Sequence, residues 1–242
     1  MEKVFDLITR SEADLVFLLE VTPAKYEYLK TKTDSVIYSL DYRKPGKYDS
    51  KGRKLGIVLL HGKDVEIVET GVFDRTLLPE RTLWANILYK DKPFKAVAFH
   101  SITGCDHKKA KSLFFNSMAE AVDDYKPDIV TIDANEPSKD FYTIEGMEFY
   151  NRNGDGARNL FNCIKDNGLV DSYAVNYDQS QYIEGQPLTP SHYVQYKKNN
   201  AKRYDFVFIN TDKLKVDKSE YLMDEALEAT GDHAVVRVDV DG

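Results

Sequence analysis

The chain has 242 residues, a length that one large mixed domain commonly occupies, and we expect residues 1–242 to form a single domain. A hydrophobic fraction of 42% and a charged fraction of 30% are ordinary for a globular protein and exclude wholesale disorder. The 40 acidic and 33 basic residues give a net charge of -7, which argues against broad non-specific binding to nucleic acid or to anionic membranes. A local basic path near an acidic site is compatible with this charge.

Cysteine usage and hydropathy exclude further classes of protein. The two cysteines, Cys105 and Cys163, are far apart and lack metal-ligand spacing, so neither a disulfide framework nor a structural zinc site is indicated. No apolar run approaches the roughly 20 residues needed to span a bilayer, and the first residues lack the pattern of a secretion signal. We therefore expect a cytoplasmic protein without a membrane span, although a secreted protein whose leader has been removed would read the same way. The sequence does not indicate an oligomeric state.

The first elements alternate between helix and strand. A helix is expected near Val4–Thr9, followed by an apolar strand over Leu15–Glu20. Thr22 can cap a second helix and Pro23 suits its first turn.

Two hairpins are expected next. After a strand at Ser35–Leu40 and a polar turn segment, the runs Leu55–Leu60 and Val65–Val72 lie on either side of His61-Gly62 and indicate a hairpin. The runs Leu83–Tyr89 and Phe94–His100 flank a four-residue turn and indicate another.

The second half of the chain mixes helices with short buried strands. Helical spacing of apolar residues predicts helices over Asp106–Tyr125 and Gly156–Asn167. Short apolar runs predict strands at Ile129–Ile132, Phe206–Ile209 and Ala234–Val240, with a long polar and aromatic segment at 178–202. Strand-rich halves with helices outside them favour an α+β fold, a four-layer α/β sandwich of two mainly antiparallel packed sheets flanked by helices.

Several polar residues lie at the ends of predicted strands, where side chains from different strands can converge at one rim. Each residue alone is typical of a turn or a helix cap. Taken together they form a candidate site: Glu20, His100, Asp133, Asn135, Asp205, Asp232 and His233.

This set of side chains suits the hydrolysis of a phosphate ester. Carboxylate oxygens prefer Mg²⁺ or Mn²⁺ to zinc, and such a cation neutralises phosphate charge and stabilises a leaving oxygen. An imidazole or carboxylate can deprotonate the attacking water, and amide or imidazole donors can hold the phosphate oxygens. The candidate site contains a group for each of these tasks.

Five segments resemble motifs of the endonuclease/exonuclease/phosphatase superfamily, in the order in which that superfamily has them. They are Leu15-Val-Phe-Leu-Leu-Glu20-Val-Thr-Pro, Ala96-Val-Ala-Phe-His100-Ser, Ile132-Asp133-Ala-Asn135, Arg203-Tyr-Asp205-Phe-Val-Phe-Ile and Gly231-Asp232-His233-Ala-Val. The resemblance spans residues 15–236 and implies a metal-dependent phosphoesterase with the four-layer fold.

The resemblance also implies a role for each motif residue. Glu20 would be the main metal ligand, with Asp232 as a second or water-mediated ligand. Asp133 would position the water or a second metal, and Asn135 would donate to a phosphate oxygen. His233 would contact the phosphate or act as the base.

Two further residues complete the implied site. Asp205 would fix the tautomer of His233 by a hydrogen bond. A histidine at the place of His100 is typical of the deoxyribonuclease, sphingomyelinase and phosphoinositide phosphatase branches rather than of abasic-site endonucleases.

Substrate contacts are expected outside this set. Arg81 stands where an arginine would contact phosphate, although a solvated surface arginine fits the sequence as well. In the segment 192–203, aromatic residues alternate with cations in a way that can stack bases and follow a phosphate backbone, although a solvated polar loop is the alternative. The candidate substrate-binding residues there are Tyr193, Tyr196, Lys198 and Arg203.

The sequence also departs from the superfamily. Its members open with a strand that carries an asparagine, whereas Met1 lies only 19 residues before Glu20 and we can place no such strand. Three hypotheses therefore stay open: a Mg²⁺- or Mn²⁺-dependent phosphodiesterase, first of all a nuclease acting on DNA or RNA; a phosphomonoesterase or a lipid or inositol phosphate hydrolase; and a catalytically weak binding module.

Overall fold

A six-stranded sheet forms the centre of the computed structural model, which describes residues 1–45, 54–103, 108–150, 154–194, 200–229 and 231–241. Its strand order is β4-β5-β6-β7-β11-β8. All neighbouring strands are antiparallel except β6 and β7, which are parallel. The strands are β4 (Val65–Gly71), β5 (Thr82–Tyr89), β6 (Lys92–His100), β7 (Ile129–Asp133), β8 (Leu169–Asp171) and β11 (Asp205–Asn210).

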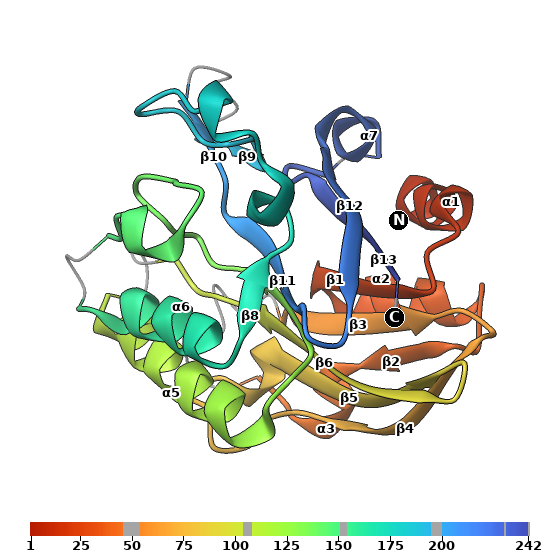
Figure 1. Ribbon diagram of the computed structural model, residues 1–242. Coiled ribbons are helices and arrows are strands. Elements are labelled where there is room, and N and C mark those ends of the chain that lie inside the picture. Colours follow the sequence, from red (N-terminus) through yellow and green to blue (C-terminus); the bar gives the residue numbers. More distant parts are fainter. Residues whose placement is uncertain (46–53, 104–107, 151–153, 195–199, 230, 242) are drawn as a thin grey trace.

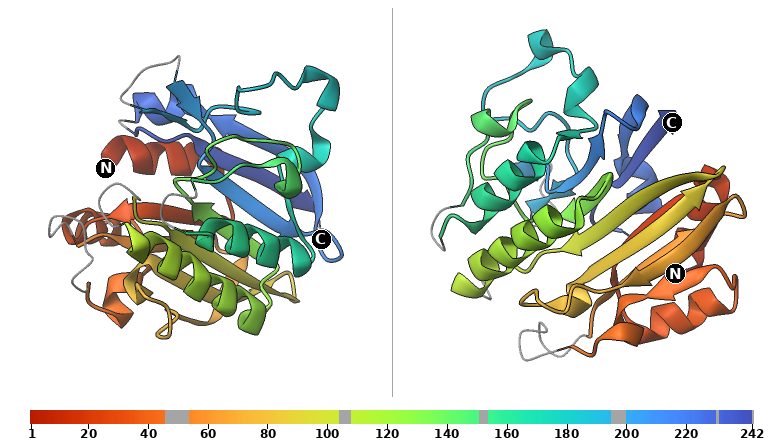
Figure 2. Two further views of the ribbon diagram at one scale, coloured as in Figure 1. Left: turned by 90° about the vertical axis from the view of Figure 1, so that its left-hand side faces the viewer. Right: turned by 60° about the horizontal axis from the view of Figure 1, so that its bottom comes forward.

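Two helices cover one face of this sheet. They are α5 (Lys109–Tyr125) and α6 (Gly156–Asp166), which lie side by side in every view (Figures 1 and 2). Phe114 and Met118 of α5 and Phe161 of α6 are buried against Phe206 and Phe208 of β11. The backbone N of Gly156, the first residue of α6, donates to Oγ of Ser112 on α5. The helix ends before Gly168, whose φ of 77° suits glycine.

Two smaller sheets pack on the opposite face. The three-stranded sheet has the order β1-β3-β2, with β1 (Leu15–Val21), β2 (Val36–Tyr38) and β3 (Gly56–His61). Ile57 and Leu59 of β3 pack against Leu83 and Ala98 of the central sheet. The two-stranded sheet pairs β12 (Lys215–Leu222) with β13 (Val235–Asp241) and packs on β11.

Helices form the outermost layer on this side. They are α1 (Glu2–Ser11), α2 (Pro23–Lys30), α3 (Ser39–Tyr42) and α7 (Met223–Glu228). Tyr26 and Leu29 of α2 are buried against Val58 and Leu60 of β3, whereas α1 buries no residue completely and lies beside α7 (Figure 1). The predicted four-layer α/β sandwich is therefore confirmed.

Short elements connect these layers and deliver residues to one end of the sheets. The 3-10 helices are η2 (Pro79–Arg81), η3 (Ile144–Gly146), η5 (Ala174–Asn176) and η6 (Gln179–Gln181), and a small hairpin pairs β9 (His192–Tyr193) with β10 (Ala201–Lys202). The hairpin and η6 belong to the segment 178–202, which the sequence left without elements.

One of the two predicted hairpins is wrong. The strands on either side of His61-Gly62 do not pair: β3 lies between β1 and β2, and β4 pairs with β5 in the other sheet. Both runs have the composition of strands, and local periodicity cannot distinguish a turn within a sheet from a crossing between two sheets. The hairpin of β5 and β6 is present, and its turn residues Lys90 and Asp91 have φ of 50° and 64°.

Other predictions concern the two ends of the chain. The strand β12 and helix α7 were missed, because the sequence Lys215–Glu228 is largely charged and has little periodicity. Before β1 the structure describes only α1, and among the described residues β1 is paired with β3 alone and β13 with β12 alone.

None of the described helices is long and apolar enough to cross a membrane.

Candidate active site

Strand pairing places three of the predicted residues in one row. His100 at the end of β6 is the register partner of Asp133 at the end of β7. Asp133 is in turn the register partner of Asp205 at the start of β11. Register partners project to the same face of a sheet, at the spacing of neighbouring strands. The central sheet therefore brings together groups that lie more than one hundred residues apart in the sequence.

Glu20 reaches this row from the other sheet. The pairing of β1 with β3 is irregular between Leu18 and Val21, and Glu20 has a φ of 55°, an uncommon conformation for a non-glycine residue. The bulge turns the Glu20 carboxylate toward His100, with 3.1 Å between Oε1 and Nε2. The hydrogen bond from His100 lowers the pKa of Glu20 to about 2, although burial opposes this shift. Glu20 is therefore an anion, and its side chain is still 55% exposed.

Arg81 holds the other side of the His100 ring. Its Nη1 lies 2.9 Å from Nδ1 of His100, and the residue is 2% exposed. A guanidinium can only donate, so Nδ1 accepts and the ring proton sits on Nε2, directed at Glu20. We expected Arg81 to contact substrate phosphate or to be solvated; its burial excludes the solvated alternative, and its contact to His100 places it beside the site.

The loop after β7 arranges Asp133 and Asn135. Asn135 has a φ of 50°, and both its backbone N and its Nδ2 donate to Oδ1 of Asp133, at 3.0 and 3.2 Å. Burial, together with the charge of Asp205, raises the pKa of the Asp133 carboxyl, while His233 and His100 oppose the shift. Lys111 of α5 donates to the carbonyl of Asn135 at 2.8 Å and anchors the loop.

Asp205 and His233 form a hydrogen-bonded dyad. Nδ1 of His233 lies 2.8 Å from Oδ2 of Asp205, as expected for a carboxylate that fixes the tautomer of the imidazole. Burial alone would lower the pKa of His233, but the charges of Asp205 and Asp133 outweigh it and raise the pKa to about 10. The imidazole is therefore protonated at neutral pH and presents a cation to the site.

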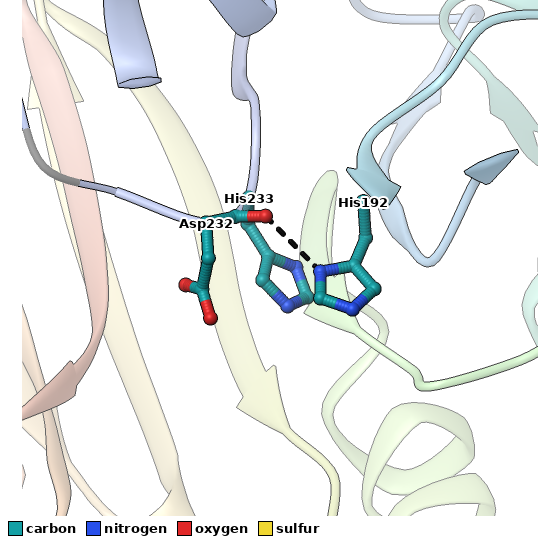
Figure 3. Close-up of side chains that lie close together, drawn as sticks. All are labelled: His192, Asp232 and His233. Carbon is teal, nitrogen blue, oxygen red and sulfur yellow. Dashed lines mark hydrogen bonds between the residues drawn. The ribbon is translucent and has the colours of Figure 1, made fainter. Parts of the chain in front are cut away.

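Asp232 precedes the dyad histidine in the turn before β13 and is exposed. Its backbone carbonyl accepts a hydrogen bond from Nδ1 of His192 at 3.0 Å (Figure 3). His192 is a site residue that the sequence did not single out, because it comes from the β9–β10 hairpin and no local pattern connects it to residues 232–233. Its ring centroid lies 4.4 Å from that of His233.

The structure places the predicted basic and aromatic substrate contacts in different environments. Tyr193 lies on β9 and is partly buried, and Tyr196 and Lys198 fall outside the described residues. Arg203 is a correction: its side chain is 0% exposed, and its guanidinium binds Asp140 through two hydrogen bonds of 2.9 and 2.8 Å and Asp171 through one of 2.6 Å. A buried guanidinium whose three nitrogens all donate to carboxylates stabilises the fold and cannot meet a substrate.

Solved structures share this arrangement of strands and helices. No family model matches the chain, and no curated protein sequence does. An endonuclease/exonuclease/phosphatase from Bacteroides vulgatus is 16% identical with a TM-score of 0.62, and the match covers 99% of this chain and 89% of the other. D. rerio TDP2 complexed with a single-stranded DNA product is 15% identical with a TM-score of 0.63, covering 100% and 91%. The mannosyl-6-phosphatase of Bacteroides thetaiotaomicron VPI-5482 is 17% identical with a TM-score of 0.59, covering 99% and 90%.

The chain has the fold of the endonuclease/exonuclease/phosphatase superfamily. The likeness establishes the fold, and the chemistry of the site has to be argued from its own side chains. Five motifs of the chain resemble this superfamily. The structure brings their acidic, amide and histidine side chains to one end of the packed sheets.

The donor set fits a hard divalent cation. Glu20 is an exposed anion, and the neighbouring Asp133 is a carboxyl whose pKa burial raises. Both carboxylates flank Nε2 of His100, at 3.1 and 3.7 Å. Two further groups could offer ligand atoms within 4.8 Å of one another: His192 with Asp232 and His233, and Asp133 with Asp205 and His233. The oxygen-rich side around Glu20 and Asp133 suits Mg²⁺ or Mn²⁺ best.

Proposed function

We propose that the protein is a Mg²⁺- or Mn²⁺-dependent phosphodiester hydrolase that acts on nucleic acid. The observation that carries the proposal is the row of His100, Asp133 and Asp205 across three neighbouring strands. Glu20 closes this row on one side and His233 on the other. Anionic oxygen ligands, a buried carboxyl and a fixed cationic imidazole within one row are what the hydrolysis of an anionic ester requires.

Glu20 would hold the metal ion, with Asp232 as a further oxygen ligand. When bound, a divalent cation supplies Lewis acidity that neutralises phosphate charge and stabilises the leaving oxygen. Glu20 is suited to this because it is ionised and exposed, and because the hydrogen bond from His100 directs its carboxylate. His100 itself has both ring nitrogens engaged, so we assign it to orientation of Glu20 rather than to proton transfer.

Asp133 is our candidate for the general base. Its carboxyl has a raised pKa, which increases its affinity for the proton that an attacking water must lose. In the proposed step the proton passes to Asp133, the water oxygen bonds to phosphorus, and the ester oxygen leaves. Asn135 keeps the carboxylate oriented through its hydrogen bond to Oδ1.

His233 is our candidate for the contact to the non-bridging phosphate oxygens. The sequence left open whether it binds phosphate or acts as the base; a pKa of about 10 favours the first role, because a protonated imidazole donates and cannot accept a proton. Asp205 keeps the ring in place and balances its charge.

Nucleic acid is the first substrate class to test, because a similarly folded protein, TDP2, is known in complex with single-stranded DNA. The burial of Arg203 removes one cation from the stacking surface that the sequence indicated. The substrate class therefore rests on the site and on this likeness rather than on a basic surface. The likeness to a mannosyl-6-phosphatase makes phosphomonoesters the main competing class.

The test is hydrolysis of plasmid, single-stranded DNA, RNA, bis-p-nitrophenyl phosphate and p-nitrophenyl phosphate with Mg²⁺ or Mn²⁺. We expect cleavage of the diesters that EDTA abolishes and that Glu20→Gln reduces by about 100-fold or more, together with weaker Mn²⁺ binding in calorimetry. Glu66→Gln, an exposed carboxylate on β4, is the matched control. Activity that survives both EDTA and Glu20→Gln contradicts the proposal. Cleavage of the monoester alone makes the protein a phosphatase, and metal binding without any cleavage makes it a binding module.

A further inference from the structure

The β9–β10 hairpin is joined to the turn that carries Asp232 and His233. His192 and His233 form an antiparallel bridge, and the backbone N of Ala234 donates to the carbonyl of Ser191 at 2.7 Å. The bridge and this hydrogen bond hold together two segments that lie about forty residues apart in the sequence.

Ser191 also holds the partner of His233. Its side chain is completely buried, and its Oγ accepts hydrogen bonds from the backbone N of Tyr204 at 2.8 Å and of Asp205 at 3.2 Å. One dipeptide, Ser191-His192, therefore contacts both members of the dyad. The dipeptide thus links the backbone of Asp205 to the turn that carries His233.

The His192 ring makes the outermost contact. A carbonyl oxygen can only accept, so Nδ1 of His192 carries the proton that it donates to the carbonyl of Asp232. The ring lies against His233 and is nearly parallel to Tyr204, with 5.9 Å between centroids and 24° between planes. In the view of Figure 3, the ring of His233 stands between the His192 ring and the Asp232 carboxylate.

We propose that His192 is a positioning residue whose Nδ1–H fixes the Asp232–His233 turn and so keeps His233 aligned with Asp205 and with the phosphate. This role rests on the proposed function, because it serves the same site. It assigns no substrate contact to His192: the residue acts through the turn, in the way that outer hydrogen bonds orient the ligands of metal and phosphate sites.

The competing role is that of a metal ligand, since His192, Asp232 and His233 offer ligand atoms within 4.8 Å of one another. One feature favours positioning. Nδ1 of His192 already donates to the backbone carbonyl of Asp232, so this nitrogen is not available to an ion.

Amide side chains can separate these roles, because asparagine places a donor near the position of Nδ1 and glutamine places one near Nε2. We expect His192→Asn to keep kcat within about 3-fold of the original chain, and His192→Gln and His192→Ala to lower kcat by about 10- to 100-fold with little change in KM. Mn²⁺ affinity is expected to stay unchanged in His192→Asn, because this variant keeps the turn that carries Asp232 in place. Thermal unfolding of each variant verifies that it is folded.

A second readout does not need activity. The imidazole N–H of His233 that faces Asp205 should give a protected, downfield proton resonance in the apo protein. We expect this resonance to persist in His192→Asn, to broaden or shift in His192→Gln and His192→Ala, and to disappear in Asp205→Asn, which assigns it.

Several results would overturn the inference. Retained activity in His192→Gln with loss in His192→Asn would mean that Nε2 meets the substrate. A fall in Mn²⁺ affinity in all three variants would make His192 a ligand. An unchanged His233 resonance in every variant would remove the positioning role altogether. If the original chain cleaves no phosphate ester, the proposed function fails, and the resonance still decides whether His192 positions His233.

Discussion

Two clusters of charge meet at Arg203 and Asp205, two residues apart in the sequence, and differ in how completely the protein satisfies them. Around Arg203, one guanidinium binds two carboxylates, and the Asp140 and Asp171 oxygens also accept backbone N–H groups. Around His233, three carboxylates share one imidazolium, and Glu20 remains largely exposed. The first cluster is complete in itself, whereas the second leaves acceptor capacity and negative charge for a ligand.

This difference is a physical guide to function. A buried ion cluster whose hydrogen bonds are all made contributes to folding, since removal of one member leaves a charge without a partner. A cluster with unbalanced charge and uncommon backbone conformations at Glu20 and Asn135 is held in place by the rest of the fold. Such a cluster indicates a site that a cation and an anionic substrate complete.

The largest effect on activity is expected from Asp133→Asn. Removal of the proposed base should lower kcat by about 100- to 10,000-fold. Stability should be equal or higher at neutral pH, because the raised pKa of Asp133 means that the ionised carboxylate disfavours the folded state. Steady-state kinetics on bis-p-nitrophenyl phosphate and urea unfolding measure both quantities. A variant that is inactive and also strongly destabilised would mean that Asp133, like Arg203, serves to stabilise the fold.

The largest effect on stability is expected from Arg203→Met. Without the guanidinium, Asp140 and Asp171 become buried charges without a cationic partner, and the free energy of unfolding should fall by about 3–5 kcal/mol. Urea unfolding followed by circular dichroism measures the loss. Arg237→Met, which removes an exposed pair with Asp239, is the matched control and should change stability by less than about 1 kcal/mol. Equal losses in the two variants would mean that the buried cluster stabilises the fold no more than an exposed ion pair does.

A smaller loss of stability is expected from Ser191→Ala. The change removes the hydroxyl that accepts from the backbone of Tyr204 and Asp205, and a buried donor left without a partner costs about 1–3 kcal/mol. The exposed Ser180→Ala on η6 serves as the control. A lower kcat in this variant would mean that the hydroxyl also positions the active site. A change in stability alone would mean that it only stabilises the fold.

The smallest effect is expected from pH in the neutral range. The folded pKa of His233, about 10, lies above its ordinary value of 6.5, so the stability gained from the charged imidazole is fully present below pH 6.5 and is lost as pH rises through about 10. This one group should therefore lower the free energy of unfolding by about 1 kcal/mol between pH 7 and 8, and the decline should level off above about pH 10. His233→Leu should flatten this decline. Unfolding midpoints measured between pH 6 and 11 compare the two proteins, and parallel curves would show that His233 is not the titrating group.

Much of the site could be predicted from the sequence because its residues stand at the ends of apolar strands. The runs that end at Glu20, His100 and Asp133 are short, strongly apolar and followed at once by polar residues, a pattern that marks a buried strand and its rim. The order of the five motifs then indicated a fold that the solved structures confirm. Local composition is sufficient for this step because it decides which residues are buried.

Tertiary structure decided the remainder, since side chains compete for partners across the whole chain. Arg81 and Arg203 look alike in the sequence, as cations beside a strand, yet one supports His100 and the other joins two carboxylates in the core. The turn at His61-Gly62 joins two sheets instead of closing a hairpin, because β3 finds its partners in β1 and β2. His192 reaches the site only through the pairing of a small hairpin with the turn before β13. The sequence alone determined which residues could form the rim, and long-range pairing determined which of them meet there.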